Sequence, residues 1–205
     1  MGIYLNPDNN QYKRLCNSPI FVDKTLLIEY TNQIIDTGNN CICVSRPRRF
    51  GKSTDANMLV AYYSKGTDSK ALFNTLNVSS CSTYLKHLNK HNVIHLNIQD
   101  FLSTTNSIDE MLFKINRMIL KDLKFKFKDV ISETEIIDAF NEVFAYTKNK
   151  FIFIIDEWDC IFREFKIDKA AQETYLDFLR RSSIVFNCSL ALVSSSFILV
   201  IDLNW

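Results

Sequence analysis

The sequence is poor in glycine and proline, and it lacks long apolar runs. Only four of its 205 residues are glycine, which is few for an open α/β fold. No internal repeat, low-complexity segment or flexible linker divides the chain, so we expect one domain over residues 1–205. The first ten residues are polar and show no apolar signal segment. The apolar runs near the C-terminus are too short to cross a membrane, so no membrane partner is expected.

The sequence also lacks the paired cysteines of a zinc site and any large net charge. The six cysteines include no C-x-x-C pair and lie at positions 16, 41, 43, 81, 160 and 188. This scatter excludes a disulfide framework or a cysteine zinc site, and it predicts reduced, packed thiols in a cytoplasmic protein. The net charge is +1, so global charge gives no reason to expect binding to nucleic acid. Apolar residues make up 47% of the chain, as in globular proteins.

One loop carries most of the chemical information in the sequence, the segment Ser45-Arg-Pro-Arg-Arg-Phe-Gly-Lys-Ser53. It fits the phosphate-loop pattern G-x-x-x-x-G-K-[ST] at Gly51, Lys52 and Ser53, and departs from it at Arg46. Loops of this kind hold phosphate through backbone N–H groups and a helix N-terminus, while the lysine neutralises charge and the hydroxyl binds Mg²⁺. The alternative is a plain helix start, in which the glycine ends a loop and the lysine is solvated.

The residues on either side of this loop favour the phosphate interpretation. Before it, Cys41–Val44 is a short apolar run of the kind that forms a buried strand. After it, residues 55–64 place apolar side chains at helical spacing. Strand, loop and helix therefore follow in the order that a phosphate loop requires. Arg46, Arg48 and Arg49 add three guanidinium groups, which could clamp phosphate or remain solvated or paired with carboxylates.

A second polar site follows an apolar run about a hundred residues later. Residues 151–155 are five consecutive apolar side chains, ending in Asp156 and Glu157. Such a run predicts a strand buried on both faces, and ligands of open α/β sheets bind at the carboxyl ends of strands. Asp156 could hold Mg²⁺, and Glu157 could orient and deprotonate an attacking water. The alternative makes Asp156 a helix N-cap and Glu157 a first-turn charge.

Together these segments resemble the AAA-ATPase-like proteins of bacteria and archaea, which often carry a C-terminal PD-(D/E)xK nuclease-like domain. The resemblance covers roughly residues 10–180, and the Arg-Pro-Arg-Arg-Phe-Gly-Lys-Ser form is highly specific. That family usually has arginine where the first glycine is missing. The segments that carry the resemblance are Phe21–Thr25, Arg46–Ser53, Leu72–Phe73, Ile155–Asp159 and Tyr175–Arg180.

The resemblance implies an ATP-binding P-loop protein that hydrolyses ATP with Mg²⁺. It places Lys52 and Ser53 at the phosphates and the metal, with Asp156 and Glu157 as the Walker B pair. On this basis we expect Glu157 and Lys52 to be catalytic, and Ser53 and Asp156 to hold Mg²⁺. The residues expected to bind the nucleotide are Arg48, Arg49, Phe50, Gly51, Lys52, Ser53 and Thr54.

The fold expected is a three-layer α/β P-loop domain with a mainly parallel sheet. Its strands are predicted near residues 41–45, 93–98 and 151–155. Besides the helix that follows the loop, the main helices are predicted at 24–35, 108–127 and 133–147. Residues 1–40 form an N-terminal lead-in and helix, 41–180 the nucleotide-binding core, and 181–205 a divergent tail. His95, within the second strand, is expected to be a packed or edge histidine.

The tail after Arg181 departs from the family pattern and allows two interpretations. One makes Leu190–Val193 or Phe197–Ile201 a replacement strand, with Ser194–Ser196 in a sensor-like position. The other, which we favour, is a truncated or frameshifted end, which would leave the fold incomplete at its C-terminus. An exposed end of this β-prone kind would promote aggregation.

Two further functions remain as alternatives to ATP hydrolysis. The chain could be a nucleotide-binding interaction module that does not hydrolyse, or an inactive fragment of a longer ATPase–nuclease protein. A P-loop kinase for small molecules is disfavoured, because adjacent Asp156 and Glu157 suit water activation better than transfer to a bound acceptor. Related ATPases often receive an arginine from a neighbouring copy. The sequence assigns no residue to that role, and a homo-oligomer or another protein partner stays open.

Overall fold

In the part of the chain that the structure describes, four strands form a single sheet at the centre of the molecule. The computed structural model describes residues 2–35, 37, 41–45, 50–132, 135–149, 151–182 and 196–201. The order across the sheet is β1-β4-β3-β2. The strands are β1 (Cys41–Ser45), β2 (Asn92–Asn97), β3 (Phe151–Asp156) and β4 (Ser196–Ile201). The three strands expected from the sequence are confirmed, each within a residue or so of its expected bounds.

The directions of the strands differ from the expected, mainly parallel arrangement. β2 and β3 are parallel, whereas β4 is antiparallel to both of its neighbours, β1 and β3. Since β1 and β3 both oppose β4, the strands β1, β2 and β3 run in one direction. No direction was predicted for the strand at 197–201, because an apolar run indicates burial and carries no information on direction. Of the two candidates for a replacement strand, 197–201 is a strand, while 190–193 lies outside the described residues.

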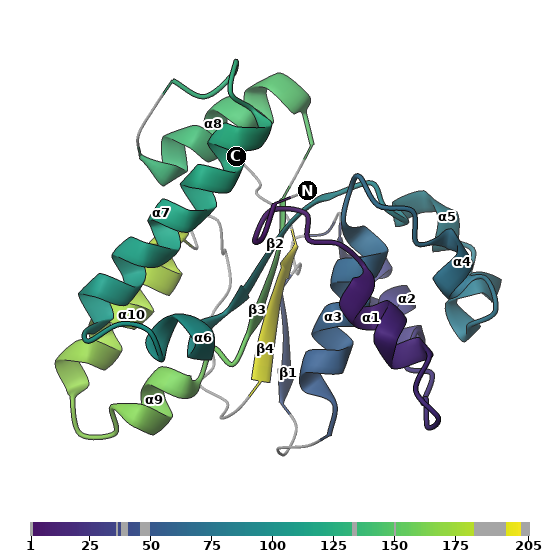
Figure 1. Cartoon of the computed structure of the whole chain (residues 1–205), viewed down its shortest axis with the longest axis horizontal. Helices are drawn as coiled ribbons and strands as arrows, with labels where there is room; N and C mark the ends of the chain where they lie inside the picture. The colour runs from purple at the N-terminus through teal and green to yellow at the C-terminus, as the bar shows by residue number, and fades with distance from the viewer. Residues whose placement is uncertain are drawn as a thin grey trace.

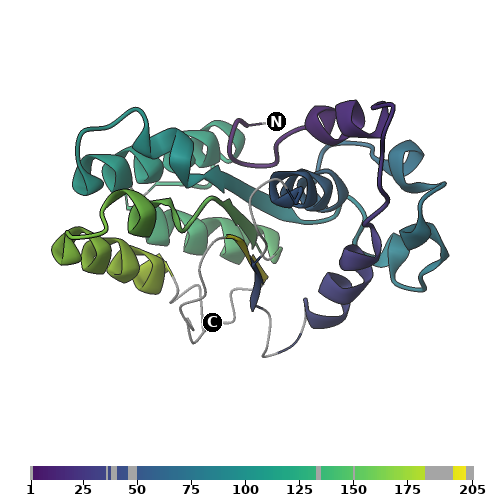
Figure 2. The same cartoon turned by 90° about the horizontal axis from the view of Figure 1, so that it is seen from below.

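Helices cover both faces of this sheet (Figures 1 and 2). On one face lie α6 (Ile98–Leu102), α7 (Ile108–Lys126), α8 (Ile136–Thr147), α9 (Cys160–Glu164) and α10 (Lys169–Ser182). On the other lie α1 (Asn10–Cys16), α2 (Leu26–Ile34), α3 (Lys52–Tyr63), α4 (Lys70–Phe73), η1 (Asn77–Ser80) and α5 (Tyr84–His87). The mixed α/β class expected from the sequence is therefore confirmed.

Two hydrophobic cores result, one on each side of β3. Every residue of β3 is buried, as its continuous apolar run predicts. Phe151, Phe153 and Ile155 pack against α7 and α8, whereas Ile152 and Ile154 pack against α3. Successive side chains of a strand point to opposite faces, so this single strand contributes to both cores.

The predicted helices are confirmed, with shifts at their starts. The helix expected at 24–35 begins at Leu26, and the helix expected at 133–147 begins at Ile136. The long helix α7 matches its expected bounds, because Ser107 accepts a hydrogen bond from the N–H of Glu110 and fixes its first turn. None of the helices in the described ranges combines the length and apolarity that crossing a lipid bilayer requires.

The described cysteines agree only in part with the expected packed thiols. Cys16, Cys43, Cys81 and Cys160 are free. Cys160 is buried, and burial raises the pKa of its thiol to about 12, so it stays protonated at neutral pH. Cys43, by contrast, is exposed. Within the described ranges no cluster of three His, Cys, Asp or Glu side chains could hold a metal ion by itself.

Candidate functional site

A cleft of about 550 Å³ opens at the carboxyl edge of the sheet, where the main sequence motifs meet. It draws residues from four segments: the start of α3, the end of β2 with the start of α6, the turn after β3, and α9. Such an edge is where open α/β sheets bind ligands. The residues that line the cleft are Gly51, Lys52, Ser53, Thr54, Asn97, Gln99, Glu157 and Arg163.

The phosphate-loop motif enters the cleft through a turn that glycine makes possible. Gly51 has a φ of +77°, in the left-handed region, and serves as the N-cap of α3. A Cβ at this position would lie 2.7 Å from Nζ of Lys24. Lys24 Nζ donates a hydrogen bond of 3.0 Å to the carbonyl oxygen of Phe50 and forms an ion pair of 3.1 Å with Asp55. Lys24 therefore clamps the end of the loop onto α3, a role that the sequence did not reveal.

The residues after Gly51 form the first turn of α3 and face the cleft with different exposures. The Lys52 side chain is largely buried, with 8% of its surface exposed. Ser53 is exposed and Thr54 is half-buried. The N–H groups of this first turn have no acceptor within the helix, so they and the helix dipole attract an anion. Phe50 is exposed. Arg48 and Arg49 lie outside the described residues, as does Arg46.

The two predicted carboxylates end β3, and they take different positions. Asp156 is buried in the last position of the strand, and its Oδ1 accepts a hydrogen bond of 3.0 Å from the N–H of Glu157. Glu157 lines the cleft, whereas Asp156 does not. Helix α9 begins only at Cys160, with Asp159 as its N-cap. The alternative in which Asp156 caps a helix and Glu157 occupies its first turn is therefore wrong.

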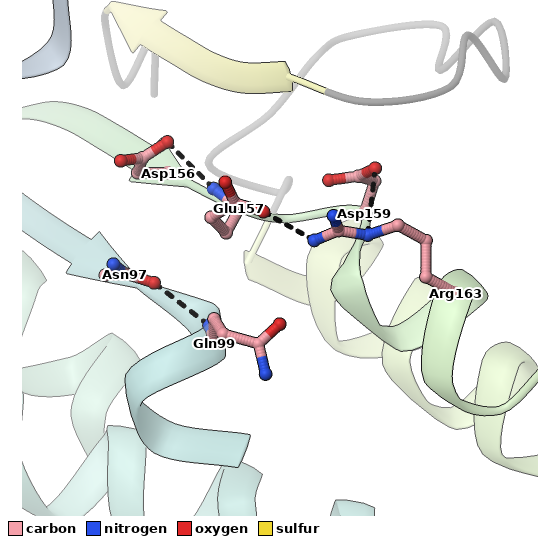
Figure 3. Close-up of polar contacts among 6 residues, drawn as sticks. All are labelled: Asn97, Gln99, Asp156, Glu157, Asp159 and Arg163. Atoms are coloured by element: carbon pink, nitrogen blue, oxygen red, sulfur yellow. Dashed lines mark hydrogen bonds and ion pairs between the residues drawn. The ribbon is translucent and has the colours of Figure 1, made fainter. Parts of the chain in front are cut away.

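Glu157 adopts a backbone conformation that few side chains tolerate. Its φ is +53°, which for a residue with a Cβ is uncommon. Such strained residues gather at functional sites, where the surrounding structure holds them in place. Here the turn directs the Glu157 carboxylate away from the sheet and toward the helix that follows (Figure 3).

Arg163, in α9, binds two of these acidic residues at once (Figure 3). Its Nη2 lies 2.5 Å from Oε2 of Glu157, and its Nε lies 3.4 Å from Oδ2 of Asp159. Partial burial acts to lower the pKa of the guanidinium, but the hydrogen bond to Glu157 and the charges of both carboxylates raise it overall. The sequence left this residue unnoticed, although its spacing from Asp159, four residues along a helix, is a signal for an ion pair.

The end of β2 contributes two polar residues beside Glu157. Asn97 pairs in register with Asp156, and its Oδ1 accepts a hydrogen bond of 3.0 Å from the N–H of Gln99. This bond turns the chain from the strand into α6 and brings Gln99 to the wall of the cleft (Figure 3). The sequence shows Gln99 only as a polar residue after an expected strand. The parallel register of β2 and β3 was needed to place it near Glu157.

His95 lies on the same strand as Asn97 but does not line the cleft. Burial lowers the pKa of its imidazole, and the charges of Asp156 and Asp100 oppose this shift only in part. The pKa lowered by burial agrees with a packed histidine.

A family model described as predicted AAA-ATPase matches residues 10–198 of the chain. The chain belongs to the AAA-ATPase-like family. The match includes both the loop and the Asp156–Glu157 pair, and it continues beyond residue 180, where the motifs alone end. No curated protein and no solved structure matches the chain.

Membership of the AAA-ATPase-like family supports a general ATPase-like function for the chain. The cleft brings the start of α3 and the glutamate after β3 together in one space. In this AAA-ATPase-like chain, the expected site residues that meet in the cleft are Gly51, Lys52, Ser53, Thr54 and Glu157.

Proposed function

We propose that this AAA-ATPase-like protein has a three-layer P-loop fold, binds ATP and hydrolyses it with Mg²⁺. One observation carries the proposal: the cleft places the start of α3 and Glu157 on the walls of one space. The start of α3 suits the binding of phosphate, and Glu157 suits the activation of water. Hydrolysis needs both groups around the terminal phosphate.

The phosphate side of the site consists of the first turn of α3 and Lys52. The N–H groups of that turn point along the helix axis toward the cleft, so they bind phosphate oxygens without further rearrangement. Lys52 supplies a positive charge, and its limited exposure keeps that charge from being screened by water. Both features stabilise the negative charge that the terminal phosphate carries during transfer to water.

Ser53 and Asp156 fit the requirements of a magnesium site. Mg²⁺ retains several waters and binds one or two carboxylates together with substrate phosphates, so a full set of protein ligands is unnecessary. Among the residues that the structure describes, the Asp156 carboxylate accepts one hydrogen bond, from the N–H of Glu157, which leaves acceptor capacity for a hydrated cation. Ser53 is exposed at the loop. When bound, Mg²⁺ neutralises charge on the phosphates.

Glu157 is the residue that we assign to water activation. It lines the cleft beside Gln99, and a carboxylate accepts the proton that water loses on attacking phosphorus. Gln99 can orient the same water through its side-chain amide, which makes no hydrogen bond within the described ranges.

The variant Glu157→Gln tests this assignment. The amide keeps the size of the side chain but cannot take a proton, so ATP binding should persist while turnover falls by about 10²–10⁴-fold. Turnover is measured by phosphate release and binding by calorimetry. Glu164→Gln, an exposed carboxylate in the same helix as Arg163, is the matched control and should leave both unchanged. A Lys52→Ala variant that binds ATP as well as the parent would contradict the proposal.

A second candidate, a nucleotide-binding module that does not hydrolyse, is favoured by the ion pair between Arg163 and Glu157. A carboxylate held at 2.5 Å by a guanidinium is a poorer acceptor for the proton of water. If the unmutated protein binds ATP but releases no phosphate, this second candidate replaces the first.

A further inference from the structure

Arg163 contacts two carboxylates, one buried and one accessible. Each is contacted by a different edge of its guanidinium group. The side chain of Asp159 is 7% exposed, whereas that of Glu157 is 30% exposed. The Nε edge of the guanidinium faces the buried partner, and Nη2 reaches the partner that lines the cleft. Asp159 can therefore retain the arginine while Nη2 exchanges one acceptor for another.

The cleft offers such a second acceptor when a nucleotide is bound as proposed above. The first turn of α3 would hold the inner phosphates, so a terminal phosphate would extend toward Glu157, the residue assigned to water. Arg163 lines the same cleft and contacts Glu157 directly. A terminal phosphate carries more charge than a carboxylate and three acceptor oxygens, so it competes effectively for a guanidinium. A nucleoside diphosphate has no group in that position.

We propose that Arg163 determines the preference for nucleoside triphosphates and positions Glu157. Its guanidinium binds either the Glu157 carboxylate, as in the structure, or the terminal phosphate of a bound triphosphate. When the guanidinium leaves the Glu157 carboxylate and binds the terminal phosphate, Glu157 is free to accept a proton from water. This inference rests on the proposed function and extends it by naming the residue that distinguishes triphosphate from diphosphate.

The exchange predicts an energetic coupling between Arg163 and Glu157 that appears only with a terminal phosphate. Binding of ADP and of adenylyl imidodiphosphate, an ATP analogue that resists hydrolysis, is measured for the parent, Arg163→Ala, Glu157→Gln and the double variant. Arg163→Ala should weaken binding of the analogue about tenfold, which corresponds to ~1.4 kcal/mol, and change ADP binding by less than about twofold. Glu157→Gln should tighten binding of the analogue about fivefold, because its neutral amide competes less for the guanidinium.

The double variant decides between this exchange and simple charge repulsion. In the Arg163→Ala background, Glu157→Gln should no longer tighten binding of the analogue, since the competition has been removed. If it tightens binding equally in both backgrounds, repulsion between Glu157 and phosphate explains the effect, and the proposal is overturned. Equal weakening of ADP and analogue by Arg163→Ala would also overturn it, because it would indicate a purely structural role.

A conservative variant and a control variant complete the experiment. Arg163→Lys retains the charge but lacks the second edge that faces Asp159. The logarithm of the ratio between its affinities for the analogue and for ADP should therefore be about half that of the parent. This variant keeps the test available if the alanine variant does not fold. Arg117→Ala is the control, an arginine on α7 that lies 6.0 Å from the ring of Phe113 and does not line the cleft. A parent protein that binds neither nucleotide would refute the proposed function itself, an outcome distinct from those above.

Discussion

At the scale of single residues, the cleft depends on two positions with left-handed backbone. Gly51 reaches φ +77° without a Cβ, while Glu157 reaches φ +53° with one. For a residue with a Cβ, this conformation costs about 1–2 kcal/mol. The two residues thus meet the same demand in different ways. The loop uses the one residue type that adopts the turn freely, whereas the turn after β3 holds a strained residue whose side chain lines the cleft.

Gly51→Ala should weaken nucleotide binding by about tenfold, or ~1.4 kcal/mol. The added Cβ would push Lys24 away from Phe50 and Asp55, since Lys24 Nζ lies 2.7 Å from its position. Gly66→Ala is the matched control: its φ is +95°, but no atom lies within 4 Å of the added Cβ. Both variants should unfold more easily, by about 1–2 kcal/mol. Equal nucleotide affinity in the two variants would contradict the role given to Lys24.

Asp23 makes the stability of the N-terminal half depend on pH. Burial acts to raise the pKa of its carboxyl, but the hydrogen bonds from Asn77 N–H, Thr25 Oγ1 and Thr25 N–H lower it overall. Because the folded pKa is depressed, the stabilisation is complete above the unfolded value of about 3.9 and is lost as pH falls through the folded value.

Asp23→Asn should therefore lower the free energy of unfolding at pH 7 by about 1 kcal/mol. The difference from the parent should shrink as the pH falls below about 4, where the parent carboxyl becomes protonated. Urea titrations between pH 7 and pH 3 measure this. Asp129→Asn, at an exposed position, should show no such dependence. A difference that stays constant down to pH 3 would rule out the depressed pKa as its cause.

At the scale of elements, a buried polar network joins α2 to α3. The hydroxyl of Tyr63 donates a hydrogen bond of 2.7 Å to Oδ1 of Asn32 and lies 2.5 Å from Oγ1 of Thr31. The amide of Asn32 donates in turn to the hydroxyl of Tyr62, at 3.0 Å. Since α3 carries the phosphate-loop residues at its start, this network fixes the helix that the cleft depends on.

Tyr63→Phe should destabilise the fold by about 1–3 kcal/mol, because it leaves the buried Asn32 oxygen without this donor. Thermal or urea unfolding provides the measurement. Tyr146→Phe removes the same hydroxyl from a side chain that is 71% exposed, and it should change stability by less than about 0.5 kcal/mol. Similar losses in the two variants would mean that the network contributes no more than a surface hydroxyl.

The elements also show how far the sequence could predict the fold. The apolar run of residues 151–155 and the amphipathic pattern of α7 predicted their elements closely, since each pattern follows directly from which faces are buried. The direction of β4 was not predicted, because an apolar strand has the same pattern in both directions. Pairing and direction depend on contacts between distant parts of the chain.

The residues of the candidate site that lie together in one sequence motif were predicted. Those that only the folded chain brings to the site were missed. Gly51, Lys52, Ser53 and Thr54 are adjacent in sequence, and they line the cleft together with Glu157. Arg163 required the turn after β3 and the start of α9 to bring its guanidinium back to Glu157. Lys24 required the packing of the N-terminal segment beside α3. Neither residue belongs to a local phosphate-binding pattern.

At the scale of the whole molecule, β3 connects two cores that would otherwise be separate. Ile154 is fully buried in the core beside α3, whereas Trp158 is buried in the core on the opposite face. Because both cores use side chains of β3, loss of packing on one face should weaken the other. We therefore expect the two faces to unfold together.

Ile154→Ala should lower the free energy of unfolding by about 2–5 kcal/mol through the cavity that it leaves. In a Trp205→Phe background, which leaves Trp158 as the single tryptophan, the midpoint of urea unfolding followed by fluorescence should fall as much as the midpoint followed by far-UV circular dichroism. Ile167→Ala, at a side chain that is 94% exposed, is the control and should leave both midpoints in place. A Trp158 transition unmoved by Ile154→Ala would show that the two faces unfold independently.

The position of β4 in the sheet has a consequence for the order of events during protein synthesis. Among the described strands, β1 pairs only with β4, and Cys41 lies opposite Val200. Ribosomes extend chains at roughly 5–20 residues per second, so β1 leaves the ribosome several seconds before its partner exists. During that interval the strand that leads into the phosphate loop has no neighbour in the sheet. Pairing of β1 in the sheet therefore waits until residues 196–201 have been made.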